Sequence, residues 1–127
     1  MMKILVTDGM ERNAINNLVN EGFEVEEKFY EEEVLKEKIK DVDVIVVRSA
    51  TKIRKNIIHE ALKTGSLKLI IRGGVGLDNI DVAYAEAKGI MVRNTPGAST
   101  NAVAELVLCE MLVLARNVKI ASGTRKT

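Results

Sequence analysis

Short apolar runs alternate with amphipathic stretches along this chain, and this alternation constrains the fold more than any other feature. Runs of this length, bounded by glycine and polar residues, are typical of strands buried in a parallel sheet. We expect strands at Lys3–Thr7, Phe23–Glu27, Val42–Val47, Leu69–Ile71 and Ile90–Val92. We expect helices at Met10–Asn20, Glu31–Lys40, Arg54–Lys63, Asp78–Lys88 and Thr100–Asn117.

Strands that alternate with helices at short intervals predict an α/β fold with a parallel five-stranded sheet and helices on both faces. The expected strand order is 2-1-3-4-5, as in flavodoxin-like domains. The strand Phe23–Glu27 alternates with charged residues, so we expect it at an edge of the sheet. The helix Glu31–Lys40 has acidic residues first and lysines last, which suits its dipole, and we interpret this as a solvated face.

Composition excludes several classes of function. The chain has 127 residues, of which 46% are hydrophobic, enough for the core of one domain. A net charge of +1, with no basic tract and 3% aromatic residues, argues against binding to nucleic acid. No apolar run reaches the roughly 18 residues of a membrane span. A single cysteine, Cys109, and a start without a signal-peptide pattern indicate a reducing cytoplasm, and one histidine with one cysteine cannot form the usual metal site.

A glycine-rich turn after the fourth strand is the sharpest functional signal. Arg72 follows the strand directly, and Gly73, Gly74 and Gly76 come next, before a helix expected to begin at Asp78. Such a turn presents bare backbone N–H groups beside one guanidinium, an arrangement suited to a carboxylate or a phosphate.

This turn does not match the dinucleotide fingerprint G-x-G-x-x-G. Gly74 and Gly76 supply the first two glycines, but Asn79 occupies the third position. On spacing alone a structural turn is as plausible as a binding loop. The expected proximity of Arg48 favours binding.

Three loops should meet at the carboxyl edge of the sheet, where ligands bind in open α/β folds. They are Arg48–Ala50, Arg72–Gly76 and Asn94–Thr95. Each arginine could be an ordinary surface residue, but both directly follow buried strands. Two arginines, a hydroxyl, an amide and free N–H groups predict a site for a small anionic molecule.

The last expected helix is nearly apolar on all sides, since Glu105 and Glu110 are the only charged residues within Ala102–Ala115. We expect it to pack against layers that this chain does not contain or against a second subunit. Cys109 within it is expected to be a small buried hydrophobic residue.

The remaining candidate residues and functions have weaker support in the sequence. His59 has no carboxylate or cysteine at catalytic spacing, and Asp8, at the end of the first strand, is a weak candidate for a polar contact. A receiver-type signalling domain would need a phosphoacceptor aspartate after the third strand, where Arg48 stands instead.

Four ordered motifs resemble those of the NAD-dependent D-isomer-specific 2-hydroxyacid dehydrogenases, over nearly the whole chain up to about Asn117. The motifs are Val47–Thr51, Arg72–Asp81, Gly89–Gly97, and Ala102–Leu106 with Leu114–Arg116. The Arg-Ser-Ala-Thr loop favours the branch that oxidises 3-phosphoglycerate in serine synthesis. The resemblance implies reversible oxidation of a 2-hydroxy acid to a 2-keto acid, with NAD as cofactor.

The resemblance also implies roles for individual residues. The substrate would be bound by Arg48, Ser49, Arg72, Gly74, Val75, Gly76 and Asn94: the Gly74–Gly76 backbone would hold its carboxylate, Arg48 and Ser49 its phosphate end, and Asn94 would line the cleft. The nicotinamide would face Val75, Thr100 and Val103.

The chain departs from the family in one large respect. The family's nucleotide-binding domain supplies the catalytic arginine, glutamate and histidine, and no residue here matches them. We therefore expect a substrate-binding domain at 1–98, an inter-domain or dimerisation helix at 99–117 and a loose tail at 118–127. We expect the chain to be truncated, and we expect that by itself it neither binds NAD tightly nor turns over substrate. The alternative is a stand-alone carboxylate-binding or dimerisation module.

Overall fold

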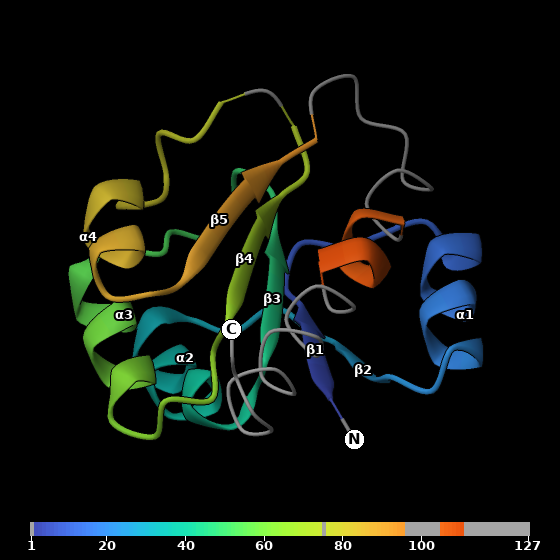
Figure 1. Cartoon of the computed structure of the whole chain (residues 1–127), viewed down its shortest axis with the longest axis horizontal. Helices are drawn as coiled ribbons and strands as arrows, with labels where there is room; N and C mark the ends of the chain where they lie inside the picture. Colours follow the sequence, from blue (N-terminus) through green and yellow to red (C-terminus); the bar gives the residue numbers. More distant parts are fainter. Residues whose placement is uncertain (1, 75, 96–104, 111–127) are drawn as a thin grey trace, which may run out of the picture.

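The structure is a computed structural model that describes residues 2–74, 76–95 and 105–110 (Figure 1). Its strands are β1 (Lys3–Val6), β2 (Glu24–Glu27), β3 (Val44–Val47), β4 (Leu69–Arg72) and β5 (Met91–Asn94). Its helices are α1 (Arg12–Asn20), α2 (Glu32–Lys38), α3 (Lys55–Leu62) and α4 (Val82–Ala87), with a 3-10 turn η1 (Ile39–Asp41) after α2. Residues 105–110 are also helical. Strands and helices alternate as the apolar runs predict.

The five strands form one parallel sheet in the order β2-β1-β3-β4-β5. This confirms the predicted flavodoxin-like order. β2 lies at one edge, with Glu24 and Glu27 exposed, so the prediction of a charged edge strand is confirmed as well. Charged side chains on an edge strand discourage pairing with another chain.

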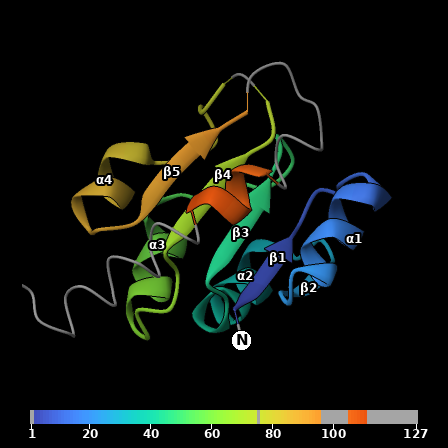
Figure 2. The same ribbon diagram turned by 45° about the vertical axis from the view of Figure 1, so that its right-hand side comes forward.

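Both faces of the sheet are covered, which explains why its central strand is apolar throughout. Helices α2, α3 and α4 lie on one face, whereas α1 and the helical residues 105–110 lie on the other (Figures 1 and 2). In β3, Ile45 and Val47 pack toward the first group of helices, and Val44 and Val46 pack toward the second. All four side chains are buried, so each position needs a hydrophobic residue.

The helix expected from Asp78 begins instead at Val82. The preceding residues have other partners: Ile80 pairs with Ile53 in an isolated parallel bridge, and the Ile53 N–H donates to the Asn79 carbonyl at 2.8 Å. Backbone already bonded across to another loop cannot form the first turn of a helix. The expected start at Asp78 was therefore wrong.

β5 extends further than expected, through Arg93 to Asn94, because β4 offers backbone partners as far as Arg72. At the last helix, residues 105–110 pack Val107 onto the sheet. The rest of the expected apolar helix lies outside the described residues. Cys109 is exposed rather than buried, because it lies about half a turn of helix away from Val107.

In the ranges that the structure describes, no helix combines the length and the hydropathy needed to cross a bilayer.

Candidate functional site

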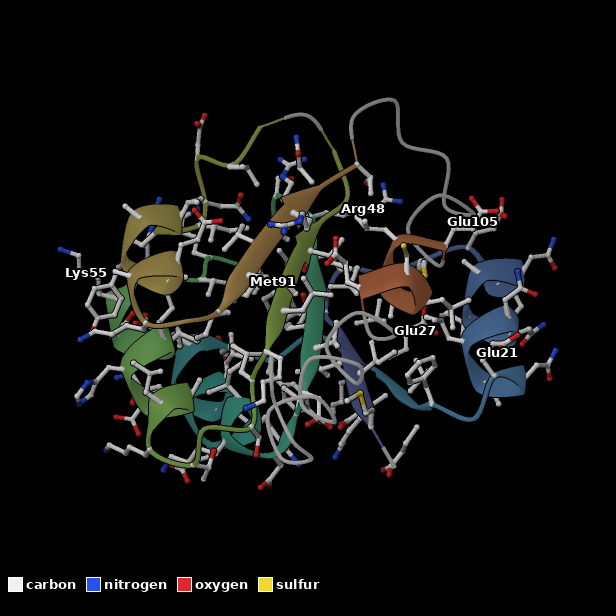
Figure 3. The ribbon with its side chains drawn as sticks, viewed as in Figure 1. Glu21, Glu27, Arg48, Lys55, Met91 and Glu105 are labelled. Carbon is white, nitrogen blue, oxygen red and sulfur yellow. The ribbon has the colours of Figure 1, made fainter. Side chains whose placement is uncertain are left out.

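The carboxyl ends of β3, β4 and β5 lie in one row at one edge of the sheet. Val47 pairs with Arg72, and Arg72 pairs with Asn94. The Gly73 N–H continues the pairing past the strand end by donating to the Val47 carbonyl at 2.8 Å. The structure therefore brings together the three loops that the sequence assigns to this edge, and Figure 3 shows Arg48 there.

The loop from Arg48 to Thr51 is held by two side chains from other loops. The Asp8 carboxylate accepts the backbone N–H of Arg48 at 2.7 Å, the N–H of Thr51 at 3.1 Å and the Thr51 hydroxyl at 2.7 Å. The Asn79 amide nitrogen donates to the carbonyls of Arg48 at 2.7 Å and of Thr51 at 2.6 Å. Asn79 is 7% exposed, so these bonds lie where an unmade hydrogen bond is costly. We call Asp8 and Asn79 the loop clamp.

Two arginines lie against the glycine turn. Gly74 has a φ of +152°, which residues with a side chain rarely adopt, so the backbone favours glycine there; a Cβ would also meet the Arg72 Nη1, the far end of a flexible side chain. The Arg72 Nη1 donates to the Gly73 carbonyl at 3.3 Å. The Arg48 Cγ and Nε lie 3.7 and 3.8 Å from the position that a Gly73 Cβ would take. The turn therefore carries positive charge close to its backbone.

The Arg72 Nε is buried and has no hydrogen-bond partner among the described residues. A buried N–H without a partner costs free energy, and such groups are often found where a ligand binds. Arg72 thus has a buried donor, the Nε–H, that the described part of the protein does not use.

A hollow of about 260 Å³ lies beside the glycine turn. It is lined by Ser49, Lys52, Arg54, Arg72, Asp78 and Asn79. Its wall offers three cations, a hydroxyl and one carboxylate. Three cations against one carboxylate suit the hollow to the binding of an anion.

The structure places the other predicted site residues apart from this hollow or does not describe them. Gly76 is exposed, and a Cβ there would meet nothing within 4 Å. Asn94 is half-buried at the end of β5 and is not in the lining. The predictions for Val75, Thr100 and Val103 fall on residues outside the described ranges and stay predictions.

Reasoning from the sequence missed Lys52 and Arg54, and it treated Asn79 only as a break in a fingerprint. Nothing in the sequence around Lys52 and Arg54 indicates a binding role, because each resembles an ordinary charged surface residue. For Asn79 a signal did exist, since asparagine in a turn often bonds backbone groups through its side chain. His59 is exposed on α3, and the described residues contain no cluster of three metal-ligating side chains.

The described residues do not fit a dinucleotide. In a dinucleotide site the pyrophosphate rests on a helix N-terminus that follows the glycine turn directly. Here α4 begins only at Val82, and its N-cap residue is Asp81, whose carboxylate already accepts the Lys55 N–H at 2.8 Å. The Asp81 carboxylate therefore stands at the helix start, where a pyrophosphate would have to bind.

Residues 4–126 match the family model described as D-isomer specific 2-hydroxyacid dehydrogenase, catalytic domain. The chain is 50% identical over 127 residues to D-3-phosphoglycerate dehydrogenase of Methanocaldococcus jannaschii, covering 99% of this chain and 24% of the relative. It is 47% identical over 125 residues to hydroxypyruvate reductase of Thermotoga maritima, covering 98% of this chain and 40% of the relative. The chain thus spans about a quarter of the first of these curated relatives and two fifths of the second.

A solved structure of NAD⁺-bound 3-phosphoglycerate dehydrogenase from Entamoeba histolytica is similar in fold. The TM-score is 0.63 and the sequence identity is 38%, over 76% of this chain and 33% of that chain.

Proposed function

Because the chain belongs to the D-isomer-specific 2-hydroxyacid dehydrogenase family, we propose that it is the substrate-binding part of an NAD-dependent dehydrogenase of the D-3-phosphoglycerate dehydrogenase type. The reaction of the whole enzyme would be oxidation of 3-phosphoglycerate to 3-phosphohydroxypyruvate, in serine synthesis. The other 2-hydroxy acids are weaker candidates, because the cations at the sheet edge favour a substrate with more than one negative charge.

The observation that carries the proposal is the pair of arginines on the glycine turn. Arg72 lies over Gly74, and Arg48 lies over Gly73, at the carboxyl edge of a parallel sheet. A carboxylate bound to the backbone N–H groups of the turn would have two guanidinium groups beside it.

We assign the individual roles as follows. The turn from Gly74 to Gly76 holds the substrate carboxylate through its backbone. Arg48 and Ser49 contact the phosphate end, with Arg72 beside the turn and Asn94 lining the cleft. The supporting observation is the shared edge, where Arg72 pairs with Asn94 and the loop clamp fixes the backbone of Arg48.

We propose that NAD, which accepts the hydride in this family, is bound mainly by other parts of the enzyme. Of this chain, only Val75, Thr100 and Val103 would face the nicotinamide. The misfit of the described residues to a dinucleotide supports the expectation that this chain alone neither binds NAD tightly nor turns over.

We further propose that residues 1–98 are the substrate-binding domain, that 99–117 form a helix leading to an NAD-binding domain, and that 118–127 are a tail. The apolar stretch Ala102–Ala115 would pair two copies into a dimer. A single cysteine suits a cytoplasmic location.

Titration of the chain with 3-phospho-D-glycerate, followed by amide NMR, tests the proposed binding. We expect the resonances of Gly73, Gly74 and Gly76 to shift, and we expect L-lactate to shift them far less. Resonance shifts confined to residues away from this edge would contradict the proposal, and so would equal shifts with L-lactate.

A hydride-transfer assay on the same preparation tests the second part. We expect no NADH to form when the chain is mixed with 3-phosphoglycerate and NAD. Clear turnover by the chain alone would overturn the proposed division of the site. Binding without turnover, together with a stable dimer of the free chain in sedimentation, would favour a stand-alone carboxylate-binding or dimerisation module.

A further inference from the structure

We infer that the hollow beside the glycine turn selects ligands that carry a second anionic group, and that Lys52 makes this selection. The inference rests on the proposed function, which places a carboxylate on the turn. It adds a specificity-determining residue, Lys52, for the phosphate end of that acid.

Lys52 differs from the other lysines of the described ranges. Each of the others has an ion pair, a hydrogen bond or an aromatic ring as partner: Lys3, Lys28, Lys36, Lys38, Lys40, Lys55, Lys63, Lys68 and Lys88. Lys52 has none of these contacts with any described residue, although it lines the hollow. Its charge is therefore not neutralised by a neighbour in this part of the protein.

The arginines of the described ranges show the same contrast. Arg12, Arg54 and Arg93 form ion pairs with carboxylates, and the Arg72 guanidinium donates to a carbonyl. The Arg48 side chain has no such contact with a described residue. Among the described residues, the two cationic side chains without such a contact, Arg48 and Lys52, thus lie four positions apart on one segment.

That segment is anchored on both sides of Lys52. Thr51 is held by the loop clamp through its N–H, its hydroxyl and its carbonyl. Ile53 is fully buried and bridges to Ile80. The backbone of Lys52 is consequently fixed at the wall of the hollow, whereas an ordinary surface lysine on a loose loop would have no defined place. An anchored backbone limits where the Lys52 ammonium can reach, which lowers the entropic cost of recognition relative to a lysine on a loose loop.

The remaining charges of the hollow leave it positive. Arg54 is compensated by Asp81, at 3.4 Å, and Asp78 is the one carboxylate in the lining. Against this one carboxylate stand the positive charges of Lys52 and Arg72, and Arg72 also lies over the glycine turn. An acid seated on the turn would therefore place a second anionic group next to Lys52. A lysine ammonium is a compact charge that suits a phosphate.

The test compares 3-phospho-D-glycerate with D-glycerate, by calorimetry on the 127-residue chain and on three variants. We expect the unaltered chain to bind the phosphorylated acid about tenfold or more tightly than glycerate. Lys52→Gln should lose about fivefold for phosphoglycerate, with glycerate unchanged, and Lys52→Arg should restore most of the affinity. The matched control is Lys55→Gln, which removes the same charge nearby but outside the hollow, and it should alter neither affinity.

Equal losses in Lys52→Gln and Lys55→Gln, with the preference for phosphoglycerate kept, would overturn the inference while leaving the proposed function intact. Equal affinity of the unaltered chain for the two acids would contradict both. A third titration, with inorganic phosphate, separates the two failures. If neither acid binds but phosphate shifts the Lys52 amide resonance, and Lys52→Gln abolishes that shift, the proposed function fails and the anion site stands. If phosphate also fails to bind, both the proposed function and the anion site at Lys52 are wrong.

Discussion

Asp8 and Asn79 hold the same two residues through opposite backbone groups. The Asp8 carboxylate accepts the N–H groups of Arg48 and Thr51, and the Asn79 amide donates to their carbonyls. The two side chains come from loops after β1 and β4, so the loop after β3 is fixed from both sides. This explains how a segment without regular secondary structure keeps its place at the sheet edge.

Asn79→Asp should destabilise the fold strongly. A carboxylate in place of the amide would face the carbonyls of Arg48 and Thr51 with no hydrogen to donate, in a position that is 7% exposed. We expect a loss of about 2–4 kcal/mol in the free energy of unfolding, measured with urea. Asn17→Asp on the exposed side of α1 is the matched control and should change it by less than about 0.5 kcal/mol. Similar losses in both variants would argue against the clamp.

Asp8→Asn should loosen the loop more than it destabilises the whole fold. Asparagine keeps one oxygen acceptor, whereas the carboxylate uses both oxygens for three hydrogen bonds. We expect faster hydrogen exchange at the amides of Arg48 and Thr51, with a stability loss of about 1–2 kcal/mol. Unchanged protection of these two amides would show that the carboxylate does not hold the loop.

Gly74→Ala should damage the glycine turn. The new Cβ would meet the Arg72 guanidinium and would require a φ of +152°, which alanine adopts only at a cost. We expect a stability loss of about 1–3 kcal/mol and a weaker affinity for 3-phosphoglycerate. Gly76→Ala is the control, because a Cβ there meets nothing and its φ lies outside the left-handed region. A Gly76→Ala variant as unstable as Gly74→Ala would contradict this account of the turn.

The hydrogen bond from Tyr30 to Glu26 should make stability depend on pH. The bond lowers the pKa of Glu26 below its ordinary value of 4.5, with a further contribution from Lys3. A lowered folded-state pKa gives stability that is present above pH 4.5 and is lost as the pH falls through the folded pKa. The same bond raises the pKa of Tyr30 above 10.0, so its stabilisation is also lost as the pH rises past that folded value.

Tyr30→Phe should therefore move the pKa of Glu26 upward, as followed by NMR titration of the carboxyl carbon. Tyr84→Phe is the control, since Tyr84 contacts Lys55 and Lys88 rather than a carboxylate. The prediction is wrong if both variants leave the titration of Glu26 where it is in the unaltered chain.

The sheet could be predicted because its signals are local. Leu69–Ile71 is an apolar run with a glycine turn after it, and crossover rules limit how such runs are ordered. The clamp could not be predicted, since Asn79 bonds residues 31 and 28 positions away. The start of α4 was missed for the same reason, because the bridge between Ile53 and Ile80 is a tertiary contact.

The burial and the interaction partners of individual side chains could not be predicted from the sequence either. Cys109 lies in an apolar stretch, but the side of the helix that meets the sheet is decided by packing at Val107. Lys52 stands out only once the partners of the other lysines are known. The proximity of Arg48 to the glycine turn was accessible, because both follow strands that the apolar runs identify.

Because of the loop clamp, the loop from Arg48 to Thr51 and the glycine turn can offer a ligand different kinds of groups. The backbone groups of Arg48 and Thr51 are already bonded to Asp8 and Asn79, so at these residues the loop can offer a ligand only side chains. The glycine turn, in contrast, can offer its own backbone. Under the proposed function, we therefore expect substitutions at positions 48, 49 and 52 to change which acid binds without disturbing the chain path, so that substrate preference can evolve at this edge of the sheet while its backbone stays the same.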